Sequence, residues 1–474
     1  MQPGDDRIIE RIFAEGVWLA ESGLHTGGEK DGSTSGVDMV LQRDASNRFF
    51  IPGSSIAGAA RNALARRFLR HSDYETGIRH EPPELRALFG FAHHDDGFAS
   101  ALIVEDAPAA GTPRACVRDG VRIQSTTGVA AHGHKYDFEV LPAGTAFAMR
   151  FQLVVHRTPS PDVNAAALFD WFAEMLRAFQ RQGDREAPIR LGARTRRGLG
   201  LGAVKQWRIN RLMMDATHRG DVLAWLRQAP ERCEAVNLDQ LGVRPQPPEG
   251  AGERFFEIQT TLKLKTSLLI RSAGVKPGQP DTLHLTEAGA ALLPGTSLAG
   301  ILRHRVERIA KTVGIDPVIV DRMFGPHGTG PDSHNLFASR VWVSENTLAN
   351  GGLLQQGRVA IDRFTGGARD AALFEEAAFW PQQTGFHVKN VTIRLVEPKP
   401  QEAWLLLLAF KDLWTGDLPL GGESSIGRGV CTGVSAVLRH SGVNGLCTLE
   451  SAGSDPAQVR RTGPWQSLEE AVRA

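Results

Sequence analysis

The pattern of hydrophobic and polar positions predicts the same kinds of element in each half of this chain. In the first half, apolar residues from Leu168 to Phe179 recur at helical spacing and predict a helix. The stretch Val121–Val155 predicts a long hairpin, because its returning strand alternates between apolar and polar residues. A strand is expected at Ile12–Ala20, and a glycine-rich turn within Leu191–Trp207 leads into a closing strand.

One helix start occurs twice, as IPGSSIAGAARNAL at Ile51–Leu64 and as LPGTSLAGILRHRV at Leu293–Val306. Pro52 and Pro294 lie 242 positions apart (294 minus 52), and the elements that follow each copy come in the same order. Each half therefore predicts a βαββαβ unit. The expected fold class is α+β, with two tandem ferredoxin-like (RRM-like) domains that carry inserted loops and long hairpins.

The same landmarks predict the domain boundaries. We expect a first domain at residues 1–207, a connector helix and linker at 208–252, a second domain at 253–437 and a C-terminal extension at 438–474. The linker is rich in Pro and Gly, as flexible connections are. The extension has no counterpart in the first half.

The repeated stretch also predicts a phosphate-binding helix end. Pro and Gly stop the incoming strand, Ser or Thr is expected to cap the helix, and the N–H groups of the first turn then point outward. Such an end attracts anions, and an arginine about two turns further on could reach a second phosphate. The alternative is an ordinary capped helix that packs small residues on a sheet. The candidate residues are Gly53, Ser54, Ser55, Arg61, Gly295, Thr296, Ser297 and Arg303.

The glycine-rich turn before each closing strand is a second candidate for phosphate contact. In the first half, RRGLGLG at Arg196–Gly202 enters a strand instead of opening a helix, which argues against a dinucleotide site. Backbone N–H groups next to glycine and arginine suit a groove that follows phosphates, although a tight turn is the structural alternative. The candidates are Arg196, Arg197, Gly198, Gly200, Gly427, Arg428 and Gly429.

Composition narrows the class of protein further. With 474 residues, 42% hydrophobic and 23% charged, the chain is an ordinary globular protein of two or three domains. Its net charge of +1 argues against a polycation, so any nucleic-acid surface must be local. No secretory signal is predicted, the apolar run Trp404–Phe410 is too short to span a bilayer, and four isolated cysteines fit a reducing compartment. We therefore expect a cytoplasmic protein without membrane association.

The order of the motifs along the chain is more informative than any single motif. The PGSS helix, an LFG step (Leu88–Gly90; MFG at Met323–Gly325), a TTG or TGG hairpin and the terminal G-x-G loop follow one another in both halves. In this order each half resembles the repeat-associated mysterious protein (RAMP) superfamily of CRISPR systems. The likeness covers about residues 10–207 and 253–437, and it is strongest to the RNA-cleaving backbone subunit of type III effector complexes. Here two such subunits would be fused in tandem, as in type III-D-like systems.

The resemblance implies a subunit that lies along a guide RNA, holds single-stranded target RNA across it and contacts the other subunits of a CRISPR effector complex. An acidic residue in the loop before the PGSS helix is implied to cleave the target with a divalent metal ion, Mg²⁺ or Mn²⁺. Asp38 matches that residue, and Asp281 matches it one position closer to its proline, with Glu287 then standing where Asp44 does. His25 matches a family position near the RNA and has no clean counterpart in the second half, so the second site is expected to be slower or silent.

The resemblance assigns two further sets of residues. The helix-end and glycine-turn candidates become RNA-binding residues. The hairpin of each half resembles the family's thumb, which is implied to wedge between bases. The thumb candidates are Thr126, Thr127, Arg363, Phe364 and Thr365.

The chemistry of a lone carboxylate beside RNA supports a metal ion. Like charges repel unless a cation lies between them, so Asp38 or Asp281 would hold the ion together with the RNA's own oxygens. The expected reaction is in-line attack of a ribose 2′-OH on its phosphate, which makes this chain a metal-dependent endoribonuclease. Asp38 would orient the metal or assist proton removal; alternatively it only caps a turn. Two competing functions stay open: an RNA scaffold with idle acidic sites, and a stand-alone single-stranded RNA-binding protein or small-molecule enzyme.

Overall fold

The protein is described from a computed structural model. The described residues are 7–28, 36–69, 81–93, 96–124, 127–157, 163–183, 188–215, 217–229, 231, 233–249, 251–273, 279–326, 337–453, 455 and 457–473. Within these ranges, no helix has both the length and the apolarity that a membrane crossing requires.

The chain divides into two compact units. Unit 1 comprises Met1–Val117, Phe138–Thr195 and Leu199–Glu253, and unit 2 comprises Arg118–Asp137, Arg196–Gly198 and Arg254–Ala474. The expected connector at 208–252 thus falls in unit 1, and the C-terminal extension falls in unit 2. Two short segments of the first half also belong to unit 2, because their arginines bind partners there, as described below.

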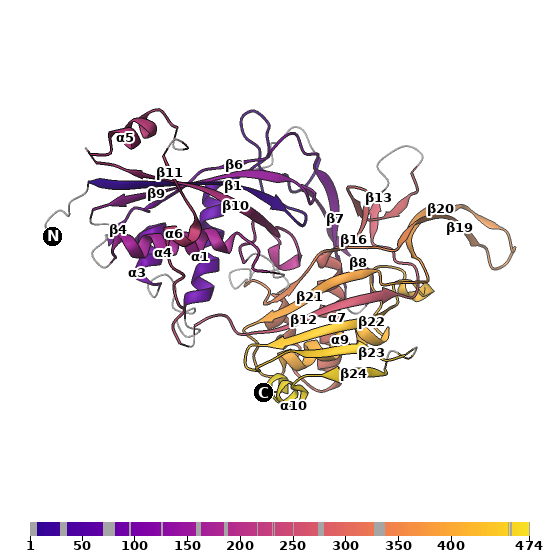
Figure 1. Ribbon diagram of the computed structural model, residues 1–474. Helices are drawn as coiled ribbons and strands as arrows, with labels where there is room; N and C mark the ends of the chain where they lie inside the picture. Colours follow the sequence, from indigo (N-terminus) through magenta and orange to yellow (C-terminus); the bar gives the residue numbers. More distant parts are fainter. Residues whose placement is uncertain are drawn as a thin grey trace. The chain divides into compact units, whose positions relative to one another are not determined.

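The main sheet of unit 1 confirms the ferredoxin-like prediction. Its strands are antiparallel and lie in the order β11-β10-β1-β9-β5. Apart from β11, this is the order 4-1-3-2 of a βαββαβ unit. Helices α1 (Gly53–Phe68) and α4 (Ala165–Ala178) provide the two crossovers and lie on the same face of the sheet (Figure 1). The strands are β1 (Ile8–Ala20), β5 (Leu102–Val104), β9 (Ala146–His156), β10 (Gly202–Met213) and β11 (Glu234–Val236).

The alternation of side chains along β1 explains why the helices cover one face only. Ile12, Ala14 and Trp18 are fully buried beneath the helices, whereas Val17 and Leu19 face the opposite side and are exposed. Each large side chain buried in this way stabilises the unit by about 1.5–3 kcal/mol. The opposite face of the sheet remains more polar.

The main sheet of unit 2 has the same topology with an extension. Its order is β17-β21-β12-β22-β23-β24, and the first four strands again form the ferredoxin-like set. The C-terminal extension adds β23 and β24 to the edge of β22, together with the amphipathic helix α10. The elements are β12 (Phe255–Leu264), β17 (Val341–Val343), β21 (Val388–Val396), β22 (Cys431–His440), β23 (Cys447–Ser451), β24 (Val459–Thr462) and α10 (Trp465–Arg473).

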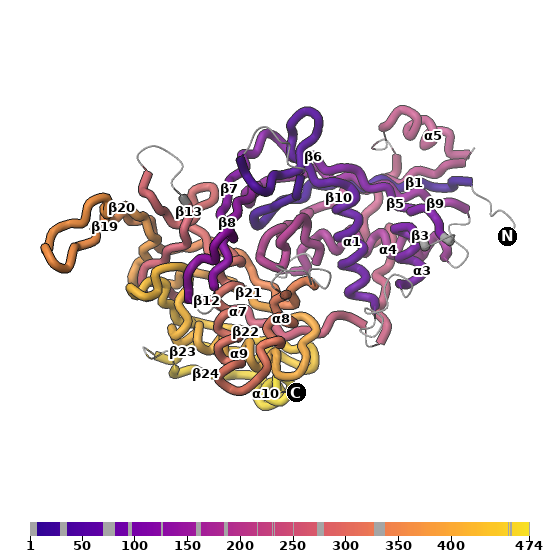
Figure 2. Tube along the Cα trace, turned by 180° about the vertical axis from the view of Figure 1, so that it is seen from behind, coloured from indigo at the N-terminus to yellow at the C-terminus, as the bar shows by residue number. Residues whose placement is uncertain are grey.

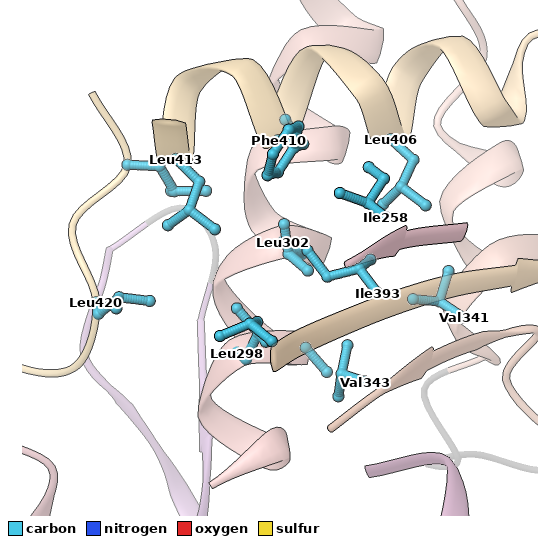
Figure 3. Close-up of a cluster of buried hydrophobic side chains, with 14 of the residues drawn as sticks. Ile258, Leu298, Leu302, Val341, Val343, Ile393, Leu406, Phe410, Leu413 and Leu420 are labelled. Carbon is cyan, nitrogen blue, oxygen red and sulfur yellow. The ribbon is translucent and has the colours of Figure 1, made fainter. Parts of the chain in front are cut away.

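Helices α7 (Gly295–Thr312) and α9 (Glu402–Thr415) form the core of unit 2 with this sheet. Figure 3 shows Leu302 of α7 and Phe410 of α9 directed toward Ile258 and Ile393 on the strands. All four side chains are buried to 1% exposure or less. This packing holds the start of α7, where the repeated PGTS motif lies, at a defined place beside the sheet.

Smaller elements surround the two sheets. In unit 2, β19 and β20 pair along their length and extend as an arm (Figures 1 and 2). The elements of unit 2 are α8 (Val318–Phe324), β13 (Arg271–Ala273), β14 (Thr282–His284), β15 (Thr286–Glu287), β16 (Ala290–Leu293), β18 (Asn346–Thr347), β19 (Gly351–Ile361), β20 (Ala368–Pro381) and a 3-10 turn at Ser424–Ile426. The remaining elements are β2 (Phe50–Ile51), β3 (Phe91–His93), β4 (Asp96–Phe98), β6 (Ala107–Pro108), α3 (Pro83–Phe89), α5 (Arg219–Leu226), α6 (Leu238–Leu241), a 3-10 turn at Thr195–Arg197, and the hairpin β7 (Cys116–Ile123) and β8 (Ala130–Val140).

Candidate functional site

In unit 1, Asp38 lies on an extended segment that is held by backbone pairing on both sides. Met39 forms a parallel bridge with Phe138, and the Glu139 N–H donates to the Met39 carbonyl oxygen (2.9 Å). Three residues after Met39, the Gln42 N–H donates to the Thr26 carbonyl oxygen (2.8 Å). The carboxylate of Asp38 is exposed on this segment. The acid therefore has a defined backbone position and access to solvent.

In unit 2, Asp281 directly precedes β14, which pairs in parallel with β20. Thr282 lies opposite Glu376, and Leu268 bridges Phe379 on the same strand. Asp281 is exposed, and its Oδ2 accepts a hydrogen bond from the Glu375 N–H (3.0 Å). This carboxylate is thus partly engaged by the protein.

The strand register makes the two aspartates equivalent. Each acid immediately precedes the residue in the parallel bridge, Met39 or Thr282. Phe138 lies three positions before Leu141 in unit 1, and Glu376 lies three positions before Phe379 in unit 2. Leu141 and Phe379 each form a bridge to a residue that follows the first strand of the main sheet. The second half is one residue shorter between the acid and the proline, and this difference therefore lies after the acid and before the helix. The sequence correspondence of Asp38 with Asp281 agrees with the backbone geometry.

His25 lies next to the Asp38 segment. It is 4% exposed, and its Nδ1 faces the Glu139 carbonyl oxygen at 2.7 Å, with Phe138 edge-on to its ring. Because a carbonyl only accepts, Nδ1 carries the proton and Nε2 keeps a lone pair. Burial lowers the pKa of His25, and the charge of Arg194 lowers it further against the effect of the Glu139 hydrogen bond. The imidazole is therefore neutral at physiological pH.

Unit 2 has no histidine at this position. Gly192 in unit 1 lies against Leu24 and the His25 carbonyl, and Gly421 in unit 2 lies against Leu268 and the Leu269 carbonyl in the same way. Leu269 therefore replaces His25. The role of His25 near RNA stays a prediction.

The helix starts differ from the prediction in how they are capped. Helix α1 has Pro52 at its N-cap without a side-chain cap, and α7 likewise begins after Pro294. In α1 the Pro52 carbonyl accepts the Ser55 N–H (3.0 Å), while Asp106 Oδ1 accepts the Gly53 N–H (2.7 Å). The predicted Ser or Thr caps are therefore wrong, because proline starts the helix one step earlier and an acid from another loop serves the first N–H.

The other residues of the helix starts differ in their accessibility. Ser54, Ser55 and Thr296 are exposed, and Ser297 is half-buried. At Gly295, an added Cβ would overlap the carbonyl oxygen of Arg197, and at Gly53 it would overlap the carbonyl oxygen of Val104. Backbone of another segment therefore lies against the first residue of both helices.

The two repeated arginines of these helices bind protein groups. Arg61 forms an ion pair with Glu81 (Nη2 to Oε2, 2.6 Å). Arg303 donates to Asp321 (2.5 Å) and to the Gly325 carbonyl (2.6 Å). Both contacts join the motif helix to the region of the LFG step, which accounts for the repeat of this arginine without a phosphate. Their RNA contact stays a prediction.

The glycine turns are built as tight turns. An added Cβ at Gly200 would overlap the Leu191 carbonyl oxygen, and one at Gly429 would overlap the Leu420 carbonyl oxygen. Both residues also have positive φ, 74° and 78°, as do Gly198 and Gly427. Close approach and left-handed backbone together require glycine here. The structural alternative thus explains these glycines, and their RNA contact stays a prediction.

The arginines of the glycine turns lie among protein partners of unit 2. Arg196 donates to the Ser339 carbonyl and lies over the ring of Trp342. Arg197 donates to the Phe324 carbonyl (3.2 Å), and burial, followed by the charges of Arg303 and Arg196, lowers its pKa to about 10. These contacts hold residues 196–198 in unit 2.

Arg428 is also a structural residue, with 3% exposure. It donates to Ser267 Oγ (3.1 Å) and forms ion pairs with Glu376 and Glu423. A guanidinium enclosed in this way holds the turn against β20. The prediction that it binds RNA is not supported by its burial.

The second hairpin presents the thumb candidates at the end of its arm. Asp362 accepts hydrogen bonds from the Thr365 and Phe364 N–H groups (2.8 and 3.0 Å), which lower the pKa of its carboxyl. Phe364 is 98% exposed, and Arg363 is exposed beside it. In the first hairpin, Thr127 donates to Gln124 (2.9 Å), and Thr126 lies outside the described residues. The thumb assignment stays a prediction.

The whole arrangement is matched by one protein family. The model of the RAMP superfamily matches residues 20–204 and 261–432 of this chain. The chain belongs to the RAMP superfamily. One curated relative is the "CRISPR system Cms endoribonuclease Csm3" of Methanocaldococcus jannaschii, 33% identical over 88 residues. That match spans 18% of this chain and 36% of the relative.

In this RAMP protein, the described residues offer no ready metal cage. Nowhere within the described ranges do three His, Cys, Asp or Glu side chains gather as metal ligands would. Glu139, the acid on the strand beside Asp38, has its Oε2 bound by the Leu41 N–H (2.9 Å) and its Oε1 by Arg43 (3.3 Å). A divalent ion would fit only with Asp38 or Asp281 as a single protein ligand, completed by RNA oxygens.

Three functional candidates of this RAMP protein were missed by sequence reasoning. Glu139 and Phe138 come from a strand about a hundred residues after Asp38, and Arg194 comes from the glycine turn. No local motif marks Glu139 or Phe138, since only strand pairing brings them to the acid. The density of arginines before Gly198 marked the region of Arg194 in the sequence. It did not distinguish Arg194 from the neighbouring arginines.

Glu287 also has an unforeseen position in the RAMP fold. It is buried and forms an ion pair with Arg118 of the first hairpin, and Glu345 binds the same guanidinium (2.5 Å). Asp44, with which the sequence aligned Glu287, instead holds its own turn by accepting the Arg48 N–H (2.8 Å). The two acids therefore serve different contacts.

Proposed function

We propose that this protein is a backbone subunit of a type III CRISPR effector complex, which binds guide RNA and cleaves complementary target RNA. The observation that carries the proposal is the pair of exposed aspartates, Asp38 and Asp281, at equivalent positions of a repeated RAMP fold. The name of the matched relative, an endoribonuclease, supports the same activity. Such a subunit would work in the cytoplasm with guide RNA, target RNA and the other subunits of the complex as partners.

The proposed reaction uses the RNA's own nucleophile. The 2′ oxygen attacks the neighbouring phosphorus, the bond from phosphorus to the 5′ oxygen breaks, and the products are a 2′,3′-cyclic phosphate and a 5′-OH. The proton of the 2′-OH must leave toward a base, and the leaving 5′ oxygen takes one from water. A bound Mg²⁺ or Mn²⁺ would supply charge neutralisation at the phosphate. Asp38 and Asp281 are the acids that solvent reaches at these positions, so we assign them the contact with the RNA.

His25 has a supporting role in this proposal. Its Nδ1–H bond to the Glu139 carbonyl (2.7 Å) ties the segment before Asp38 to β8. Because the ring is buried and its pKa is lowered, it stays neutral and adds no charge next to the Asp38 segment. It is therefore a positioning residue for the strand that faces Asp38.

A scaffold role is the second candidate for unit 2. Leu269 replaces His25 in unit 2. This difference favours a slower or silent second site that still holds RNA. The two units would then divide the work, with cleavage mainly in unit 1.

The test is cleavage by the complex purified from the native host. Short RNA that co-purifies is sequenced, and an end-labelled RNA complementary to it serves as substrate with Mg²⁺ or Mn²⁺ present. Asp38→Ala and Asp281→Ala are each expected to remove one product length, and the double variant to remove both while target binding persists. Glu450→Ala, an exposed acid on β23 outside the motifs, is the control.

Two outcomes would contradict the proposal. One is a complex without any short guide RNA, which would favour a stand-alone RNA-binding protein. The other is unchanged cleavage by the double aspartate variant. Loss of one product only, with Asp281→Ala silent, would support the scaffold role of unit 2.

A further inference from the structure

We propose that Arg358 is a positioning residue for the second cleavage site, because it fixes both the strand that holds Asp281 and the arm that extends from that strand. The inference rests on the proposed ribonuclease function and names a residue outside the predicted catalytic, RNA-binding and thumb sets. It follows from a chain of ion pairs within unit 2 that begins at the base of the arm and ends beside the acid.

The position of Asp281 is tied to strand β20. Thr282, the residue after the acid, lies opposite Glu376 in the parallel ladder, and the Asp281 Oδ2 accepts the Glu375 N–H (3.0 Å). Both contacts come from two successive residues of β20. A displacement of this part of β20 would therefore move the carboxylate with it.

Glu376 anchors this part of β20 through its side chain. That side chain is 1% exposed and forms ion pairs with Arg428 on the glycine turn and with Arg358 on β19 (Nη2 to Oε1, 2.6 Å). On β19, Gln356 lies opposite Glu376, and Arg358 lies two residues further on, opposite Phe374. The arginine and the glutamate therefore lie on the same face of the hairpin as diagonal neighbours, which long side chains can bridge.

Arg358 also reaches the glycine turn. Its Nη1 forms an ion pair with Glu423 (3.4 Å), which itself pairs with Arg428 (2.9 Å) and with Arg271 on β13 (3.0 Å). Strand β13 pairs with β14, the strand that begins directly after the acid. Arg358 is thus linked to both neighbours of β14, to β20 directly and to β13 through Glu423.

Arg358 lies where the arm leaves the rest of unit 2 (Figures 1 and 2). On one side of it, Ala378 and Phe379 of β20 are buried, whereas Val359 and Leu373, the next pair along the arm, are 43% and 73% exposed. A two-stranded hairpin without a second layer has little stability of its own. The direction of the arm therefore depends on contacts at its base, and the ion pairs of Arg358 are such contacts.

The fold of unit 2 should survive the loss of Arg358. Its side chain is 30% exposed, in contrast to the buried side chains of Glu376 and Arg428. Without Arg358, Glu376 keeps Arg428, and Glu423 keeps Arg428 and Arg271. No buried carboxylate would lose all its cations, which is the change that destabilises a protein strongly. The expected effect is a looser arm and a looser strand beside the acid.

The proposed reaction is sensitive to such a change. In-line attack requires the 2′ oxygen, the phosphorus and the leaving 5′ oxygen to be aligned next to the acid, and a misplacement of about 1 Å can cost about 10²-fold in rate. Movement of Asp281 with β20 would thus slow cleavage, while the RNA stays bound through its other contacts. Loss of Arg358 should lower the maximal rate and leave binding unchanged.

Arg358→Met tests this in the native complex, with the complex in saturating excess over end-labelled RNA complementary to its guide. We expect the product made at Asp281 to form about 10-fold to 10²-fold more slowly, and the product made at Asp38 to be unchanged. The complex concentration that gives half the maximal rate should stay the same. Arg358→Lys keeps the charge and should recover part of the loss. The control is Arg460→Met, an exposed arginine on β24.

A merely structural role would give a different result. It would lower the midpoint of thermal unfolding and raise the complex concentration that half-maximal cleavage requires, instead of lowering the maximal rate of one product. Glu376→Gln tests the route of the effect. If Arg358 acts through Glu376, this substitution slows the same product, and adding Arg358→Met has little further effect. Losses that multiply would refute that route.

The outcomes separate this inference from the function beneath it. If Asp281→Ala removes the second product but Arg358→Met leaves its rate unchanged, the role of Arg358 is refuted and the ribonuclease stands. If Asp38→Ala removes a product and Asp281→Ala removes none, unit 2 does not cleave, so the inference is refuted while the function holds for unit 1. If neither aspartate variant alters cleavage, the proposed function itself is wrong.

Discussion

Arg118→Ala is expected to destabilise unit 2 strongly. Arg118 is 4% exposed, and its guanidinium donates to Glu345 (2.5 and 3.1 Å) and to Glu287, whose side chains are buried too. Burial opposes the charge, but the two carboxylates raise the pKa of Arg118 above its ordinary value. The raised pKa means that this stabilisation is present at every pH below the ordinary arginine pKa, and so throughout the usable range.

The magnitude follows from what the substitution leaves behind. Without the guanidinium, two buried carboxylates lose their cation, and breaking a buried pair from one side typically costs about 3–5 kcal/mol. For a unit of this size, that corresponds to a fall in the unfolding midpoint of about 6–20 °C. Calorimetry of the full chain measures it, with hydrogen exchange on β12 to report unit 2. The control is Arg308→Ala, an exposed arginine on α7, with a change of about 0.5 kcal/mol or less.

A second variant makes the reasoning refutable. The triple variant Arg118→Met, Glu287→Gln and Glu345→Gln removes all three charges and should recover most of the stability. If Arg118→Ala unfolds within about 0.5 kcal/mol of the native chain, the buried cluster does not hold the hairpin in unit 2.

Three other predictions concern single positions. Gly200→Ala should destabilise unit 1 by more than about 1 kcal/mol in thermal unfolding, because φ is +74° and the Cβ would overlap the Leu191 carbonyl. Gly58→Ala within α1 should instead stabilise unit 1 by about 0.5–1 kcal/mol, because its Cβ would have no neighbour within 4 Å. Equal effects of the two substitutions would contradict this reasoning. Burial lowers the pKa of His284 to about 4 from its ordinary 6.5. The free energy of unfolding should therefore be full above pH 6.5 and fall by about 3 kcal/mol as the pH drops toward 4. A His284 imidazole that titrates near 6.5 by NMR would refute this prediction. Phe364→Ala should leave unfolding unchanged, because the side chain is 98% exposed, but should weaken target binding by the complex if the arm reaches RNA.

Local patterns were sufficient to predict the architecture. The repeat at Pro52 and Pro294 and the order of elements after each copy predicted two βαββαβ units, which both sheets confirm. Helical spacing predicted α4, because an amphipathic helix must show its apolar face in the sequence. The cap of α1 was predicted wrongly, since the acid that accepts the Gly53 N–H comes from a loop 53 residues further on.

The site was predictable only in part. Asp38 and Asp281 were found through motif order, and strand register then placed them at equivalent points. The neighbours of the Asp38 segment were not predictable, because Phe138 and Arg194 meet Met39 only through pairing between distant segments. The same holds for Arg428, whose glycine-flanked position suggested phosphate contact although its guanidinium is buried among carboxylates.

The sequence by itself determined the tandem units with their main helices and strands, and it predicted the two acids, because periodicity, turn chemistry and repeated motifs are properties of neighbouring residues. Only the tertiary structure decided which charges meet. Arg118 binds Glu345, and Arg358 binds Glu423, because side chains far apart in the chain come together only once the strands have paired and the core has closed.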